Sequence, residues 1–232
     1  MAKKSSRSMI EAFNRRMFIK YSTGAAVVAA ASGLSAPAVH AARKPVKIGF
    51  VSPQTGPLAA FGEADRFVLA DVNKVLANGI KIGKKTYPVE ILSRDSQSNP
   101  NRAAEVAAEL ILKHEVNMMI GSSSGTTVNP VSDQAEANEV PCVTADTPWQ
   151  IVYFGRGATP KKGFKWTYHF FWGIDDMLGV FMNMWGMLGT NKKIASLMVN
   201  DADGVVGGDP KRGFRPPMEG AGFNYNQPPL FQ

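Results

Sequence analysis

The chain has 232 residues, of which 26 are Lys or Arg and 19 are Asp or Glu, so its formal net charge is +7. The first 41 residues hold six basic residues and one acidic residue, which leaves the remainder of the chain close to neutral. Because that remainder has no stripe of basic residues, we exclude nucleic acid as a partner. The single cysteine, Cys142, excludes an internal disulfide framework, and its apolar surroundings predict a buried thiol.

The N-terminal segment resembles a twin-arginine export signal. Arg15 and Arg16 precede an apolar pair and a lysine, and a run of small and apolar residues follows at 24–38. That run is too short and too rich in Ala, Gly and Ser to cross a bilayer core of about 30 Å. We expect cleavage after Ala41, and no cysteine near Ala41 could accept a lipid. The sequence therefore predicts an exported, untethered protein of the periplasm.

Strands and helices alternate after residue 41. Apolar runs predict strands at 46–51, 87–92, 117–120 and 141–144. A first helix carries an apolar stripe that should be buried, formed by Leu69, Val72, Val75 and Leu76. A second follows the capping residues 98–100 and should bury Ala103, Val106, Ala107, Leu110 and Ile111. A third, of about a dozen residues, follows a serine-rich loop at 121–127. This order predicts an α/β fold with a doubly wound parallel sheet and helices on both faces.

The pattern changes after residue 148. We expect a loop at 148–165, an aromatic strand at 166–172, a helix at 177–188, a strand at 194–199 and no regular structure from Arg215 onward. Two further strands cannot build a second covered sheet, so we expect an incomplete second lobe. The predicted organisation is a signal peptide at 1–41, an N-terminal α/β lobe at 42–168, and a hinge strand with a partial, truncated second lobe at 169–232.

Three blocks, at 48–62, 95–100 and 121–133, make residues 44–223 resemble the type I periplasmic binding proteins of branched-chain amino acid and amide ABC transporters. The resemblance implies two similar lobes, joined by three hinge strands, that close on a small solute. It further implies delivery of that solute to an ABC permease of the inner membrane, with no catalysis and no cofactor. We expect the chain to be a monomer.

Loops that follow strands supply the candidate ligand-binding residues, since ligands of open α/β sheets bind beyond the carboxyl ends of the strands. These candidates are Phe61, Ser123, Ser124, Gly125, Thr126, Asp146, Thr147, Trp149 and Trp172. The hydroxyls and amides of 123–127 suit a carboxylate, although the same residues could simply cap a helix. Asp146 could pair with an ammonium, and Trp149 could stack on a planar ligand. The aromatic residues Phe61 and Trp172 face either the cleft or the core.

We expect a small solute that bears a carboxylate or an amide, such as an amino acid. The loop 144–150 departs from the small and hydroxyl residues of the amino-acid binders, which leaves an aromatic acid, urea or another amide as alternatives. A sensor domain of the same fold is a further alternative, and it would need a fused membrane or signalling module. The segment 201–207 would be the second lobe's contribution to the cleft.

A secreted α/β hydrolase is the alternative from another class, because Gly121-x-Ser123-x-Gly125 matches a nucleophile elbow. Only one histidine, His169, follows that serine, and its aromatic strand favours a structural role. The histidines and Cys142 are not at metal-ligand spacing, which predicts no metal site. Dinucleotide and P-loop glycine motifs are also absent from the sequence.

Overall fold

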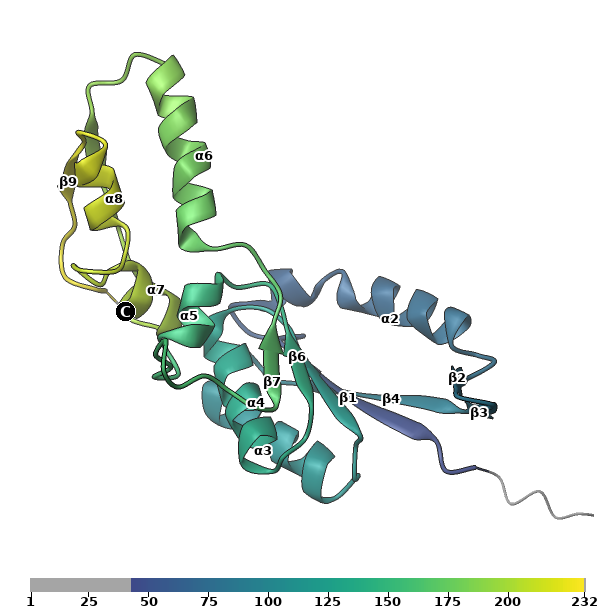
Figure 1. The fold of residues 1–232 in the computed structure, drawn as a ribbon. Coiled ribbons are helices and arrows are strands. Elements are labelled where there is room, and N and C mark those ends of the chain that lie inside the picture. Colours follow the sequence, from purple (N-terminus) through teal and green to yellow (C-terminus); the bar gives the residue numbers. More distant parts are fainter. Residues whose placement is uncertain (1–42, 232) are drawn as a thin grey trace, which may run out of the picture. The chain divides into compact units, whose positions relative to one another are not determined.

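The computed structural model describes residues 43–231, and residues 44–232 group into one compact unit. The predicted signal peptide at 1–41 lies outside the described residues. Five parallel strands form the main sheet (Figure 1). In sheet order they are β4 (Val89–Asp95), β1 (Val46–Ser52), β5 (Met118–Gly121), β6 (Cys142–Thr144) and β7 (Thr167–His169). This confirms the predicted parallel α/β architecture.

The strand order places the direction change of the chain at β1. From β1 the chain moves outward to β4, then returns past β1 to β5 and continues to β6 and β7. Right-handed crossovers in opposite directions put helices on opposite faces of the sheet. Accordingly α2 (Asp65–Val75) lies on one side of the sheet, and α3 (Pro100–Leu112) and α4 (Gly125–Ala137) lie on the other (Figure 1). The loops after β1 and β5 therefore diverge at a switch point, where open sheets bind ligands.

The hydrophobic core of this lobe lies between the sheet and the pair α3 and α4. Asn99 caps α3 by accepting from the amides of Asn101 and Arg102 at 2.9 and 3.0 Å. The five residues predicted to form its inner face are the ones that are buried, namely Ala103, Val106, Ala107, Leu110 and Ile111. They pack with Val51, Met119, Val131 and Cys142, which confirms the predicted helix and the buried thiol.

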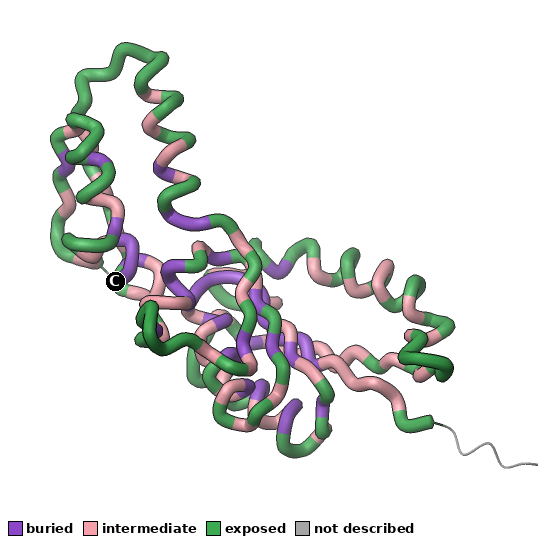
Figure 2. The backbone as a smooth tube through the Cα atoms, viewed as in Figure 1, coloured by how far each residue is buried: buried purple, intermediate pink, exposed green. Residues whose placement is uncertain are grey.

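The other face of the sheet is covered less. The apolar stripe predicted to bury one face of α2 is not buried: α2 has no buried residue among those described, and Val75 is 79% exposed. Figure 2 shows α2 as exposed or intermediate along its length, in contrast to the buried stretches of the sheet. The prediction failed because an amphipathic pattern specifies a face but not the element that covers it.

Two other predicted boundaries differ from the structure. The strand that the sequence placed at 87–92 begins at Val89, because Pro88 has no amide to donate to the sheet. The basic stretch before Pro88 forms a hairpin of β2 (Ile80–Ile82) and β3 (Lys85–Tyr87). Gly83 turns this hairpin with a φ of +60°. The predicted loop 148–165 contains a short helix, α5 (Trp149–Tyr153), and the aromatic strand shortens to β7.

The C-terminal segment contains more regular structure than we expected. It consists of α6 (Ile174–Met187), β8 (Lys193–Ala195), α7 (Ala202–Gly207), α8 (Arg215–Gly220) and β9 (Asn224–Asn226). Strands β8 and β9 pair in parallel. A second core cluster joins α5 and α6 to α7, α8 and β9 through Ile151, Leu178, Val206, Met218 and Tyr225. The expectation of irregular chain after Arg215 was wrong, because Met218 and Tyr225 bury apolar surface there.

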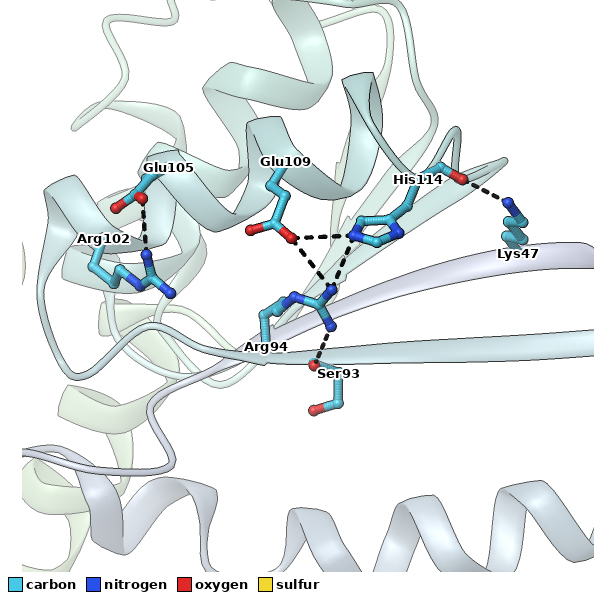
Figure 3. Close-up of polar contacts among 7 residues, drawn as sticks. All are labelled: Lys47, Ser93, Arg94, Arg102, Glu105, Glu109 and His114. Atoms are coloured by element: carbon cyan, nitrogen blue, oxygen red, sulfur yellow. Dashed lines mark hydrogen bonds and ion pairs between the residues drawn. The ribbon is translucent and has the colours of Figure 1, made fainter.

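A polar cluster ties β4 to α3 and to the loop that follows α3 (Figure 3). Arg94 Nη2 lies 3.4 Å from Glu109 Oε1 and 3.0 Å from His114 Nε2. The same His114 nitrogen lies 3.1 Å from Glu109 Oε1. The contacts with His114 and Arg94 hold the pKa of Glu109 below its ordinary value. Lys47 extends the cluster to β1 by donating to the His114 carbonyl at 2.8 Å.

Candidate functional site

A cavity of about 930 Å³ lies at the carboxyl ends of β1, β5 and β6. The loops after these strands line it, and so do the first turns of α2 and two aspartates at α7, Asp201 and Asp203. Its apolar walls include Phe61, Phe171 and Trp172. The cavity thus draws residues from the five-stranded sheet and from the C-terminal segment, at the switch point where the topology predicts a ligand site.

The serine-rich loop holds an unusual backbone conformation at the edge of this cavity. Ser123 and Ser124 have φ values of 59° and 60°, and Asp146 on the neighbouring loop has a φ of 65°. Residues other than glycine rarely adopt positive φ, and such conformations cost free energy unless surrounding contacts hold them. The two loops support each other, since the Ser124 amide donates to the Asp146 carbonyl at 3.3 Å. This brings the start of α4 against the loop after β6.

The donors at this loop bind a carboxylate that belongs to the chain itself. Asp203 Oδ2 accepts from Ser124 Oγ at 2.9 Å and from the Gly125 amide at 3.0 Å. Its other oxygen, Oδ1, accepts from Thr147 Oγ1 at 2.8 Å. We call Ser124, Gly125 and Thr147 the anion cradle. The sequence predicted the carboxylate-binding property of Ser124 and Gly125, but neither that Thr147 would join them nor that Asp203 would supply the carboxylate.

The predicted site residues divide between the cavity and its surroundings. Those that line it are Phe61, Ser124, Asp146, Thr147 and Trp172. Gly125 and Thr126 do not line the cavity. The Gly125 amide is part of the cradle, and the Thr126 amide donates to Ser124 Oγ at 3.2 Å as a helix cap. Trp149 lines a separate, smaller pocket beside Tyr153 and His169.

Several residues that line the cavity were not among the predicted site residues, Asp203 among them. Asp203 lay in a segment assigned to the cleft, but no single residue of it stood out. Asp65 and Phe171 also line the cavity. The signal for Asp65 was its position at the first turn of the helix that follows the β1 loop.

Carboxylates dominate the electrostatics of the cavity. Burial raises the pKa of Asp65 above its ordinary value, and the nearby charge of Asp146 raises it further, while Ser52 opposes the shift. The charged residues that line the cavity, among those described, are Asp65, Asp146, Asp201 and Asp203. No described Lys, Arg or His lines it.

His169 positions one member of the cradle. Its Nε2 lies 2.7 Å from the Thr147 carbonyl, which can only accept, so Nε2 carries the proton. In the neutral ring Nδ1 then accepts from Thr144 Oγ1, at 2.8 Å. Burial lowers the pKa of His169, outweighing the opposing contributions of Thr147 and Asp146. The neutral ring thus links β6, β7 and the loop that carries Thr147.

The geometry does not favour the hydrolase alternative. Ser123 is 0% exposed, and its Oγ lies 3.2 Å from Ser122 Oγ. Both ring nitrogens of His169 are hydrogen-bonded to Thr144 and Thr147. Cys142 is buried, and burial raises its pKa to about 12, far from that of a reactive thiol.

Within residues 43–231, no three His, Cys, Asp or Glu side chains cluster as a metal site would require. In the same part of the chain, every helix is too short or too polar to cross a bilayer.

A sequence family described as periplasmic binding protein matches residues 45–226. No curated protein matches the sequence significantly. Among solved structures, a leucine-binding protein from Thermotoga maritima MSB8 superposes with a TM-score of 0.64 at 20% identity. The superposition covers 81% of this chain and 49% of that protein.

Two further structures show the same fold. An ABC transporter solute-binding protein from Rhodopseudomonas palustris, in complex with 4-hydroxybenzoate, has a TM-score of 0.61 at 20% identity and covers 79% of this chain and 46% of its own. A periplasmic binding protein from Burkholderia mallei has a TM-score of 0.63 at 16% identity, with coverages of 79% and 45%. The chain therefore spans about half the length of these proteins.

Proposed function

Because the chain belongs to the periplasmic binding protein family, we propose that it captures a small solute reversibly in the cavity at the strand ends and presents it to an ABC permease of the inner membrane. The observation that carries this proposal is the composition of the cavity wall. Loops of the main sheet and residues Asp201 and Asp203 of the C-terminal segment line the same space of about 930 Å³. A solute bound in such a site contacts both the main sheet and the C-terminal segment, so its binding can favour closure of one on the other.

The size and lining of the cavity suit a small organic molecule. Pockets of roughly 300–1,000 Å³ with mostly apolar walls and a few placed polar groups are typical of small-molecule sites. One of the structural neighbours is a leucine-binding protein, and another was solved in complex with 4-hydroxybenzoate. These ligands indicate the size range to test, and the sequence also predicted a solute with a carboxylate or an amide. We therefore propose the periplasm as its location, which is also the expectation from the resemblance of the N-terminal segment to an export signal.

Solute binding can be tested on the full chain with a panel of amino acids, amides, aromatic acids and amines. A ligand that binds only the folded state at 100 times its Kd stabilises the protein by about 2.7 kcal/mol, which thermal unfolding detects readily. Isothermal titration then gives the stoichiometry and the Kd. The proposal fails if a chain with native circular dichroism shows neither a shift nor heat with any member of the panel.

A matched pair of phenylalanine variants tests the location of the site. Phe61 is 58% exposed and lines the cavity, whereas Phe67 is 72% exposed on α2 and does not line it. We expect Phe61→Ala to weaken binding of the best solute about tenfold, since a contacting aromatic ring contributes on the order of 1–2 kcal/mol. Phe67→Ala should leave the Kd unchanged. Equal effects of the two variants would place the solute elsewhere.

A further inference from the structure

We propose that this cavity selects a solute with a positively charged amine on an apolar body, and that Asp203 excludes a solute carboxylate from the anion cradle. The inference rests on the proposed function and names its substrate class. It reverses one expectation from the sequence, in which the serine-rich loop would receive a carboxylate of the solute.

Asp203 already occupies the anion cradle. All three cradle donors, from Ser124, Gly125 and Thr147, are used by the two oxygens of Asp203 at 2.8–3.0 Å. Hydrogen bonds to an ionised acceptor are stronger than neutral ones, so a carboxylate from solution must displace a tethered competitor that has the same chemistry. Tethering gives Asp203 the advantage of a high effective concentration. A solute carboxylate therefore gains little at this position.

The charges around the cavity are negative. The lining carries four aspartates, Asp65, Asp146, Asp201 and Asp203, and no basic side chain among the described residues. Arg66 is exposed and lines a neighbouring pocket of about 440 Å³, not this cavity. Within a partly desolvated space like charges repel more strongly than in water, so an anion is disfavoured and a cation is attracted.

Aromatic side chains form part of the cavity wall beside these carboxylates. Phe61 is 58% and Trp172 is 46% exposed, although both line the cavity. The Trp172 ring lies against Phe171, with centroids 4.6 Å apart. Exposed aromatic faces beside carboxylates suit an ammonium group, which is attracted by the ring quadrupole as well as by the charges. The apolar remainder of the solute can then contact Phe50, Ile120 and Val143 on the sheet.

The direction of the Asp65 pKa agrees with this assignment. Burial raises this pKa, and the charge of Asp146 raises it further against the opposing effect of Ser52, so the two carboxylates repel each other and a bound cation would relieve that repulsion. An anionic solute would increase the same repulsion.

Matched pairs of solutes that differ only in the charged group test the inference. The pairs are 4-hydroxybenzylamine with 4-hydroxyphenylacetate, and 3-methylbutylamine with 4-methylpentanoate. Isothermal titration on the full chain at pH 7.5 should give at least tenfold tighter binding for the amine of the better-bound pair. Leucine, which carries both groups, should bind no more tightly than 3-methylbutylamine.

Variants of Asp203 provide the second arm. In Asp203→Ala the cradle is free, so we expect the acid to bind at least tenfold more tightly than to the wild type and the amine to bind more weakly. Asp203→Asn keeps the size of the side chain and all three cradle donors but removes the charge, and serves if Asp203→Ala does not fold; it should shift both affinities in the same directions. Asp71→Asn removes an exposed carboxylate of α2 that pairs with Lys74 outside the cavity, and should change neither Kd.

The outcomes separate this inference from the proposed function. Tighter binding of the acids by the wild type, or acid affinities unchanged in both Asp203 variants, would overturn the amine assignment and leave solute capture intact. Binding of neither member of any pair, nor of any solute in the wider panel, would overturn both. An amine preference that Asp203→Ala reduces supports the inference.

Discussion

Glu136→Gln should destabilise the protein by about 1.5 kcal/mol at pH 7, because one carboxylate joins α4 to the chain that enters β7. Glu136 Oε1 accepts from the Lys165 amide at 2.8 Å. Its Oε2 accepts from the Trp166 amide at 2.9 Å and from Thr167 Oγ1 at 3.2 Å. Glutamine has one acceptor oxygen, so one backbone amide must face an NH₂ group. Hydrogen bonds to charged groups contribute about 1.5–3 kcal/mol, and partial exposure favours the lower value.

The pH dependence gives this prediction its sign. Burial would raise the pKa of Glu136, but the amides of Lys165 and Trp166, together with Thr167, hold it below its ordinary value. A group whose pKa is lower in the folded state stabilises the fold above its unfolded pKa of about 4.3, and this stability is lost as the pH falls through the folded value. The difference between wild type and variant should therefore be full at pH 7 and smaller at pH 3.

Urea unfolding followed by circular dichroism measures both quantities. With a slope of about 2 kcal/mol per molar urea, the midpoint should fall by about 0.7 M at pH 7. The control is Glu105→Gln, since Glu105 is exposed and only pairs with Arg102 on the same helix at 2.8 Å. That exposed pair contributes at most about 1 kcal/mol. A midpoint shift that is equal for both variants, or equal at both pH values, would refute the reasoning.

Three other outcomes follow from the core and the cradle. Leu110→Ala should cost about 3–5 kcal/mol in urea unfolding because Leu110 is fully buried, and a loss below 1 kcal/mol would contradict the packing. Gly125→Ala should cost about 1–3 kcal/mol and weaken solute binding, since its Cβ would overlap Ile151 Cγ2 and lie 3.1 Å from Ala202 Cβ; titration with the best solute checks the second effect. Because the pKa of His169 is lowered on folding, stability should fall as the pH drops below about 6.5, and thermal unfolding of His169→Gln should lack this component.

Local sequence signals predicted the elements whose partners are close in the chain. The three-and-four spacing of Ala103, Val106 and Leu110 places them on one face, and the cap at Asn99 fixes where that helix begins. The strand order then brought the serine-rich loop and the loop after β6 to one edge of the sheet. The helix face follows from the spacing of apolar residues, and the meeting of the two loops follows from the alternation of strands and helices; both patterns can be read from the sequence.

Contacts between distant segments could not be predicted in this way. Asp203 is 79 residues from Ser124, and nothing in its local sequence distinguishes it from a helix-starting aspartate. The stripe on α2 likewise has the spacing of a buried face, yet Val75 is exposed, because burial depends on which element packs against it. The irregular composition after Arg215 concealed a helix and a strand that are stabilised by Met218 and Tyr225 in a shared core.

The single buried thiol allows the opening of the core around α3 and α4 to be measured without introducing a further cysteine. Cys142 is 0% exposed between the sheet and its helices, and burial raises its pKa to about 12. A thiol reagent can modify it only after the surrounding core opens, so the labelling rate at pH 8 reports the free energy of that opening. Since the chain has one cysteine, each modified molecule records one opening event. A solute that contacts both the main sheet and the C-terminal segment should slow this labelling in proportion to its occupancy. The thiol therefore serves as an internal probe of how far solute binding protects the core from opening.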